Sequence, residues 1–259
     1  MILLTESFKC EREIMRQSLM NDAKLTISGL KDWCRNQPFV FATLAPLRER
    51  YPYRRRVVRV GDDVVIEGFP RSANTYATEA FLRLQERDIR IGNHFHSPAQ
   101  FLLASKFKVP AILVLRYPDD AILSLLIFYP KSSATELANR YISFHRPLLP
   151  IRSDFVVAPF EEVTQSFSRS ISRLNVRFGT NFVDTEIDED LRKDIFDRVN
   201  AKQAKIDSYE KSDSENLTTL PSDLKNRLKK RREAELNDPL VQASLLECRR
   251  LYQALSTEW

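Results

Sequence analysis

The fold of this chain is decided by the segment VVIEGFPRSANTY, which spans Val64–Tyr76. Its first part, Val64–Phe69, has the β-branched content and the turn-bounded length of a buried strand, and a helix is predicted to begin near Thr75. A strand, a tight turn and a helix N-terminus direct several backbone N–H groups and the positive end of a helix dipole to one point, which favours a phosphate. Arg71 adds a positive charge there, and Ser72 and Thr75 add hydroxyls.

A second segment repeats this construction further along the chain. Ala111–Leu115 is another apolar run, and Pro118 suits the first position of the helix predicted over Pro118–Phe128, because its missing N–H would be unpaired there anyway. Arg116 therefore lies at the carboxyl end of a strand, where open α/β sheets bind ligands. Ser124 reaches the same anion if the helix packs back over the strand end.

The two segments together resemble the two cofactor loops of the sulfotransferase family, which bind 3′-phosphoadenosine-5′-phosphosulfate (PAPS). The family's first loop, Pro-Lys/Arg-Ser-Gly-Thr-Thr, is matched by Pro70–Thr75, and its second by Arg116, Pro118 and Ser124. Val156–Val163 resembles the family's next strand and its Tyr-Glu-Asp-Leu segment. The likeness covers roughly residues 64–180. Ala73 and Asn74 stand where the family has Gly and Thr.

The order of elements predicts the fold class. Strand candidates at Val64–Phe69, Ile89–Asn93, Ala111–Leu115 and Phe155–Ala158 alternate with helical patterns, which implies a parallel sheet covered on both faces. The resemblance implies a three-layer α/β sandwich of the P-loop NTPase type. We expect one sulfotransferase-like domain over residues 1–259, with a cofactor-binding core at about 57–180 and a helical C-terminal part at about 181–259. A polar stretch at 207–219 is predicted to be a mobile loop, either a lid or a plain connection.

The resemblance also implies which residues bind PAPS. They are Arg71, Ser72, Ala73, Asn74, Thr75 and Tyr76 of the first segment, with Arg116 and Ser124 of the second. By this likeness Arg71 neutralises the oxygen that leaves the sulfuryl group, while Arg116 and Ser124 hold the 3′-phosphate. The family's C-terminal Arg-Lys-Gly element has no literal match, and the basic run 225–232 is a candidate substitute or simply a solvated helix face.

Two histidines follow the second strand candidate. The resemblance favours His94 as the general base, since its interval to Arg116 equals that of the family's catalytic His to the Arg of its second loop, and an imidazole suits proton transfer at neutral pH. His96 is the second candidate, and Glu79 and Glu67 are substitute bases. The two histidines could also be metal ligands or purely structural, although sulfuryl transfer needs no metal and we expect none. The remaining His145 has no motif context and is expected to be structural.

Composition limits the class of protein. The chain has 259 residues, 43% of them hydrophobic, with a formal charge of +5 and a pI near 9.1, which suits an enzyme-sized domain with anionic ligands. Its basic residues are interleaved with acids, so nucleic acid is not expected as a partner. Three widely spaced cysteines predict reduced thiols in the cytoplasm, and no apolar run approaches the length of a membrane span.

These observations predict a PAPS-dependent sulfotransferase whose acceptor is a small molecule or a saccharide carrying a hydroxyl or an amine. One alternative is a P-loop kinase or nucleotide-binding protein, but the chain has no Gly-x-x-x-x-Gly-Lys-Ser/Thr and has Arg116 where a metal-holding Asp would be expected. The other is a non-catalytic nucleotide-binding module, which Ala73 and the absence of a Lys before His94 favour.

Overall fold

The computed structural model describes residues 36–49, 56–209, 227, 229, 230 and 232–257. The strands are β1 Val64–Gly68, β2 Ile91–Gly92, β3 Ala111–Leu115 and β4 Val156–Pro159. The α-helices are α2 Pro38–Leu44, α3 Asn74–Leu84, α4 Ala99–Phe107, α5 Pro118–Phe128, α6 Ala134–His145, α7 Phe160–Gln165, α8 Phe167–Phe178, α9 Glu189–Tyr209 and α11 Pro239–Ser256. Short 3₁₀ helices are η1 Ala45–Arg48, η2 Arg146–Asp154 and η3 Ala234–Asn237.

The four strands form one parallel sheet in the order β2-β1-β3-β4. In register, Ile66 of β1 lies opposite Ile112 of β3, which in turn lies opposite Val156 of β4. Every residue of β1 and β3 is buried, because both faces of a parallel sheet are covered by helices. The predicted parallel sheet is confirmed, with β2 shorter than the five residues expected.

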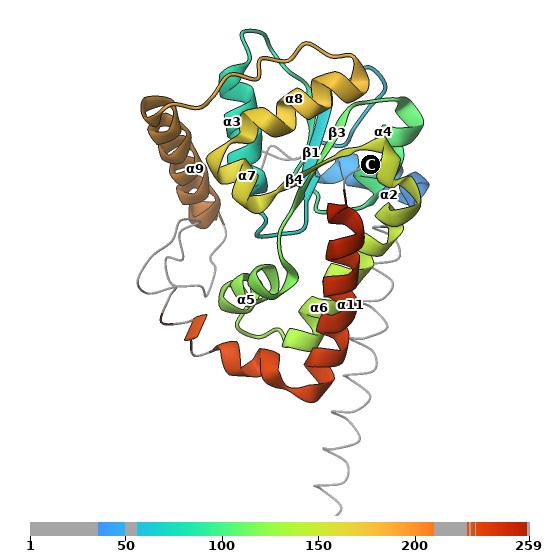
Figure 1. Ribbon diagram of the computed structural model, residues 1–259, viewed down its shortest axis with the longest axis vertical. Coiled ribbons are helices and arrows are strands. Elements are labelled where there is room, and N and C mark those ends of the chain that lie inside the picture. Colours follow the sequence, from blue (N-terminus) through green and yellow to red (C-terminus); the bar gives the residue numbers. More distant parts are fainter. Residues whose placement is uncertain (1–35, 50–55, 210–226, 228, 231, 258–259) are drawn as a thin grey trace, which may run out of the picture.

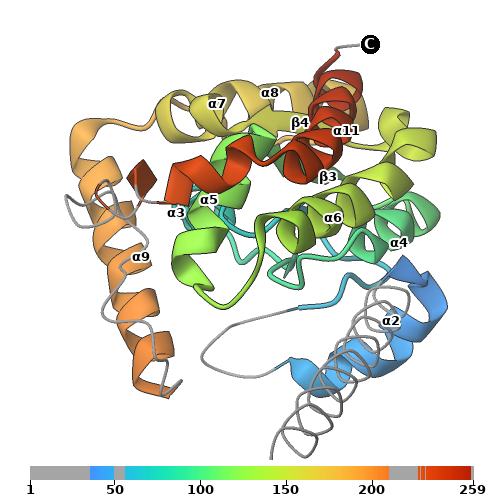
Figure 2. The same cartoon turned by 90° about the horizontal axis from the view of Figure 1, so that it is seen from below.

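Helices cover the sheet on both faces and make three layers (Figure 1). Alternate strand residues point to opposite sides, so Val65 and Leu113 pack with α4, α5, α6 and α11, whereas Ile66 and Ile112 pack with α3, α7, α8 and α9. Viewed from below, α7 and α8 lie across the sheet from α4 and α6 (Figure 2). The structure confirms the predicted α/β sandwich with a central parallel sheet.

The two central strands lead into helices on opposite faces of the sheet. β1 continues into α3 in one hydrophobic layer, and β3 continues into α5 in the other. Between the carboxyl ends of such strands the chain diverges and leaves a crevice, which is the usual ligand position in open α/β sheets. Both segments singled out from the sequence, after β1 and after β3, lie at this position.

The C-terminal part is helical, as expected, and packs back onto the sheet layers. The helix α9 packs against α3, and α11 packs against α5 and α6. Of the segment 207–219 that was predicted as a mobile loop, residues 207–209 are the last turn of α9, and the others lie outside the described residues. Among the described helices, none combines the length and the apolar composition that crossing a bilayer requires.

Gly68 of β1 packs tightly against Val114 of β3, and this contact can be tested by substitution. A Cβ atom on Gly68 would overlap the carbonyl oxygen of Val114 and lie 2.7 Å from Oδ1 of Asn74. We expect Gly68→Ala to lower the free energy of unfolding by about 3 kcal/mol, because neither neighbour can move without disturbing a strand or a buried helix start. Urea denaturation measures the loss.

The matched control is Gly92→Ala in β2, where a Cβ would meet side-chain atoms of Val58 and Val65 at 3.1 Å. These contacts are less tight than those at Gly68, so a small local shift relieves them and this loss should be about 1 kcal/mol. Equal losses for the two variants would contradict the proposed tightness at Gly68.

Candidate functional site

The loop between β1 and α3 is an unusual turn in which several polar groups have no partner among the described residues. Arg71 and Ala73 both have a φ of 68°, a left-handed conformation that non-glycine residues rarely adopt. Ala73 is the N-cap of α3 and provides no side-chain cap, so the first N–H groups of the helix have no partner from that residue. The hydroxyl oxygen of Ser72 is buried without a hydrogen-bond partner among the described residues. Strained backbone with unpaired donors is typical of an anion-binding turn.

The side chain of Asn74 holds this loop in shape. Its Nδ2 atom donates to the carbonyl oxygens of Gly68 at 3.2 Å and of Phe69 at 2.9 Å. Asn74 is 4% exposed, so its side chain fixes the turn and leaves its backbone N–H for a ligand. Tyr76 also turns inward, since its ring lies 5.3 Å from the ring of Phe196 in α9.

Arg71, Arg116 and Ser124 converge at the carboxyl ends of β1 and β3. The Nε atom of Arg71 donates to Oγ of Ser124 at 3.2 Å, and Nη1 of Arg116 donates to the backbone oxygen of Arg71 at 2.6 Å. Each guanidinium also lies over an aromatic ring, Arg71 at 5.2 Å from the ring centre of Phe128 and Arg116 at 4.3 Å from that of Phe160. The sequence predicted this grouping from two motifs that are far apart in the chain.

The two arginines form a cationic centre without a paired carboxylate. Within the described part of the chain, no ion pair joins Arg71 or Arg116 to an acidic side chain. Burial, and then the neighbouring Arg116 cation, lower the pKa of Arg71 to about 10. Burial also lowers the pKa of Arg116, which the more distant Asp120 and Glu161 partly offset. Two partly buried cations that repel one another would be stabilised by a bound anion.

In the segment after β3, the positive charge available to a ligand comes from the guanidinium of Arg116 and not from the N-terminus of α5. The first turn of α5 carries Asp119 and Asp120, which already complement the helix dipole. Asp119 accepts from Arg249 of α11 at 2.5 Å and 3.1 Å. The hydroxyl of Tyr141 in α6 donates to the backbone oxygen of Arg116 at 2.9 Å, so α6 and α11 both brace this segment.

A buried carboxylate orients His96. Glu67 is fully buried, and its Oε2 accepts from the backbone N–H groups of Phe95 at 2.7 Å and His96 at 3.0 Å. Nδ1 of His96 lies 2.8 Å from the carbonyl oxygen of Gly68 and 3.3 Å from Oε1 of Glu67. Both oxygens are acceptors, so they favour the tautomer with the proton on Nδ1, in which Nε2 is the acceptor nitrogen.

The other sequence candidates lie elsewhere or are less accessible. His94 is 9% exposed, and its ring centre is 6.2 Å from that of His96. Glu79 points to α9, where its carboxylate pairs with Lys202 at 3.1 Å. Glu67 is enclosed by donors, which suits an orienting group better than a base. Among the described residues, no group of three or more His, Cys, Asp or Glu side chains could hold a metal ion.

His145 is packed inside the protein, in line with a structural role. Its Nδ1 donates to the backbone oxygen of Tyr141 at 2.9 Å, and its ring lies 4.8 Å from that of Phe144. Burial lowers its pKa to about 3, so the ring stays neutral at physiological pH.

The described end of the basic run 225–232 has a structural role. Arg232 donates to the backbone oxygens of Leu126 at 3.1 Å, Pro130 at 3.3 Å and Ser132 at 3.4 Å, and so caps the C-terminal end of α5. Residues 225, 226, 228 and 231 lie outside the described residues.

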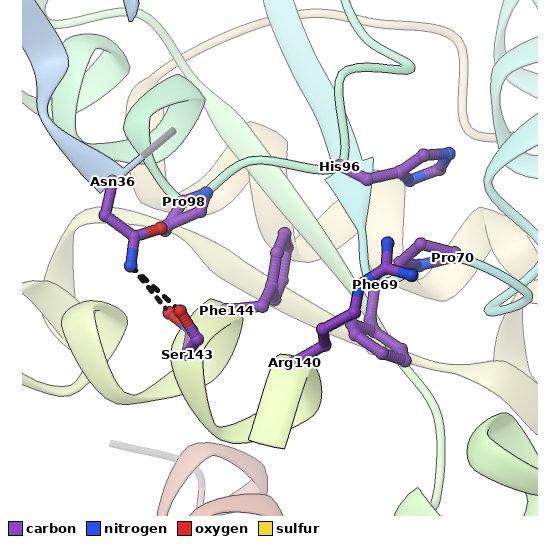
Figure 3. Close-up of a pocket in the computed structure, with 8 residues that line it drawn as sticks. All are labelled: Asn36, Phe69, Pro70, His96, Pro98, Arg140, Ser143 and Phe144. Atoms are coloured by element: carbon purple, nitrogen blue, oxygen red, sulfur yellow. Dashed lines mark hydrogen bonds between the residues drawn. The ribbon is translucent and has the colours of Figure 1, made fainter. Parts of the chain in front are cut away.

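A pocket beside the loop contains a residue that sequence reasoning missed. It is lined by Asn36, Phe69, Pro70, His96, Pro98, Arg140, Ser143 and Phe144 (Figure 3). Arg140 belongs to no motif. It lines this pocket only because α6 packs near the end of β1. The spacing of Arg140 and Ser143, which places them on one face of a helix, was the only available signal.

No protein-family model matches the chain, and no curated protein matches it. Among solved structures, the chain is similar to a mouse sulfotransferase, SULT7A1, whose crystal structure is described as complexed with PAP. The two share 12% sequence identity, with a TM-score of 0.42 over 74% of this chain and 84% of that chain. A likeness at this level does not assign the chain to a family.

The cationic centre can be tested without knowing its ligand. We expect Arg71→Met to leave the melting temperature of the ligand-free protein unchanged or raise it by about 2 °C, because the substitution removes a partly buried charge that Arg116 repels. The same variant should lose most of the stabilisation that inorganic phosphate gives at constant ionic strength. Thermal unfolding over a phosphate series measures both effects.

Arg83→Met is the control, because Arg83 is a surface residue whose Nε pairs with Asp194 at 2.7 Å. It should keep the full response to phosphate. A lower melting temperature for Arg71→Met with an unchanged phosphate response would show that Arg71 stabilises the fold and binds no anion.

Proposed function

We propose that this protein is a PAPS-dependent sulfotransferase, which transfers a sulfuryl group to a hydroxyl or an amine. One observation carries the proposal. Arg71 and Arg116 converge with Ser124 at the diverging ends of β1 and β3, and no carboxylate is paired with either guanidinium in the described part of the chain. PAPS carries charge at both a 5′-phosphosulfate and a 3′-phosphate, which suits donors from two segments.

The residues present fit such a nucleotide. The unpaired hydroxyl of Ser72, the uncapped start of α3 and the backbone N–H groups of residues 73–75 would hold the 5′-phosphate. Arg116 and Ser124 would hold the 3′-phosphate. When bound, PAPS would supply the sulfuryl group and a phosphate as its leaving group. Arg71 would stabilise the charge that develops on the leaving oxygen, which is a strong effect in a partly buried site.

We favour His96 as the general base, although the sequence favoured His94. Its Nε2 is the free acceptor of a ring whose other nitrogen is fixed by the carbonyl of Gly68 and the carboxylate of Glu67. We propose that Nε2 takes the proton of the acceptor hydroxyl, and that Glu67 is a positioning residue which stabilises the imidazolium formed. His96 also lines the pocket beside the loop, where an acceptor would approach.

One experiment separates this proposal from the two alternatives. The protein is incubated with ³⁵S-labelled PAPS and a panel of alcohols, phenols, saccharides and amines, with and without a chelator. A sulfotransferase labels at least one acceptor and keeps its activity in the chelator, because Arg71 supplies the charge that Mg²⁺ supplies in a kinase. Hydrolysis of ATP that Mg²⁺ restores would favour the kinase, and tight nucleotide binding without label on any acceptor would favour the binding module.

The assignment of the 3′-phosphate gives a nucleotide prediction. Arg116→Ala should weaken the binding of 3′,5′-adenosine bisphosphate by roughly 2 to 4 kcal/mol, because one partner of a charged pair is lost. Affinity for 5′-AMP, which lacks the 3′-phosphate, should barely change. Calorimetry with both nucleotides measures the difference, and Arg83→Ala serves as the distant control. Equal losses for the two nucleotides would remove Arg116 from the 3′-phosphate.

The choice of base gives a kinetic prediction. His96→Ala should lower turnover by roughly a hundredfold or more while the affinity for 3′,5′-adenosine bisphosphate stays nearly intact, because only proton transfer is lost. His94→Ala, the matched neighbour, should lower turnover much less. The reverse ranking of the two variants would return the role of base to His94.

A further inference from the structure

The pocket of Figure 3 adjoins the proposed site for sulfuryl transfer and shares residues with it. Phe69 and Pro70 belong to the loop that follows β1, and His96 is the proposed base. The other walls come from α6 and from the segments around Asn36 and Pro98. A group held in this pocket therefore belongs to a molecule that also reaches His96, which is the position of the acceptor.

The charge inside this pocket is positive. Arg140 is partly exposed, and among the described residues no hydrogen bond or ion pair holds its guanidinium. Figure 3 shows it extending from α6 toward Pro70. No acidic side chain lines the pocket. An arginine that lacks an internal partner beside a proposed reaction site is suited to pair with an anion of the ligand.

A second donor, Ser143, lines the pocket on the side of Asn36. Ser143 follows Arg140 by three residues in α6, so both lie on one helix face. Oγ of Ser143 accepts from Nδ2 of Asn36 at 3.0 Å, which leaves the hydroxyl proton of Ser143 free to be donated to a ligand oxygen. In Figure 3 the ring of Phe144 lies between the two side chains, so the hydroxyl of Ser143 lines the far side of the pocket and the guanidinium of Arg140 is the donor on the side of Pro70 and His96.

The size and the walls of the pocket limit which anionic group of a ligand can bind there. The pocket is partly open and its volume is about 20 Å³, so only a small end group of a ligand fits inside while the rest of the ligand stays outside. The rings of Phe69 and Phe144 and the prolines at 70 and 98 give the rest of the pocket an apolar surface. Of the common biological anions, a planar carboxylate is the smallest that an arginine binds with two hydrogen bonds.

We propose that the acceptor is a molecule that carries a carboxylate besides its hydroxyl or amine, with the carboxylate bound by Arg140 while the hydroxyl or amine faces His96. This inference rests on the proposed function, since it concerns the acceptor of that same site. Arg140 then acts as a specificity-determining residue that selects acidic acceptors over neutral ones of the same shape.

Matched pairs of probes test the inference by binding and by turnover. The pairs are 4-hydroxyphenylacetate with 4-hydroxyphenylacetamide, and glucuronate with glucose, so that only the carboxylate differs in its charge or presence. In calorimetry with 3′,5′-adenosine bisphosphate present, at least one carboxylate should bind about tenfold more tightly than its neutral partner, which corresponds to about 1.4 kcal/mol.

Arg140→Met should abolish that preference and Arg140→Lys should keep part of it. The control Arg146→Met changes an exposed arginine just beyond α6, which pairs with Glu247 at 3.1 Å, and should keep the preference.

The outcomes distinguish this inference from the proposed function. Equal binding of acidic and neutral probes, or no binding of either carboxylate, overturns the acidic acceptor even if other acceptors are sulfated. A loss of nucleotide affinity in Arg140→Met also overturns it, because Arg140 would then belong to the nucleotide site. A carboxylate bound through Arg140 without transfer of label to any acceptor supports the pocket and removes the sulfotransferase.

Discussion

The close approach of β1 and β3 at Gly68 is the constraint on which the site depends. Gly68 has no Cβ, so the backbone of β1 lies against the carbonyl of Val114, and the side chain of Asn74 fills the remaining space. The same carbonyl of Gly68 that Asn74 binds also receives Nδ1 of His96. One tight contact between two central strands therefore fixes the start of α3, the loop that carries Arg71, and the ring of the proposed base. Because all three share these few atoms, a small shift of β1 would displace every one of them.

The sequence predicted the fold well because the fold depends on local patterns. The apolar runs of β1 and β3 and the proline that starts α5 are short-range signals, and their ends agree with the structure within a residue. The grouping of Arg71, Arg116 and Ser124 followed from the rule that parallel strands end at one edge of a sheet. The roles of Glu67 and Arg140 could not be predicted, because each depends on which distant segment packs against it. Glu67 had the pattern of a buried strand residue, and only the position of residues 95–96 shows why a carboxylate is placed there.

Glu67 and Arg71 differ in whether the protein itself offsets their charge. Glu67 is satisfied inside the protein by backbone N–H groups and by His96, so its charge is offset before any ligand arrives. Arg71 has a serine, an aromatic ring and a second cation as neighbours, so its charge is not offset within the described part of the chain. A buried cation without a counter-charge lowers the stability of the fold. Proteins retain such a cation where ligand binding requires it. The contrast supports the proposal that the arginine centre binds an anion and that the glutamate belongs to the supporting framework.

The loop after β1 links the two halves of the proposed site. Its first residues, Phe69 and Pro70, form a wall of the pocket that contains Arg140, and its last residues present donors at the start of α3. Between them Arg71 and Ala73 hold positive φ angles, which only a well-supported turn maintains. A nucleotide bound at residues 71–75 and an acceptor bound against Pro70 would therefore contact the same rigid turn from two sides. In the proposed site this geometry would fix the distance between donor and acceptor through the backbone, which orients the two reactants toward each other.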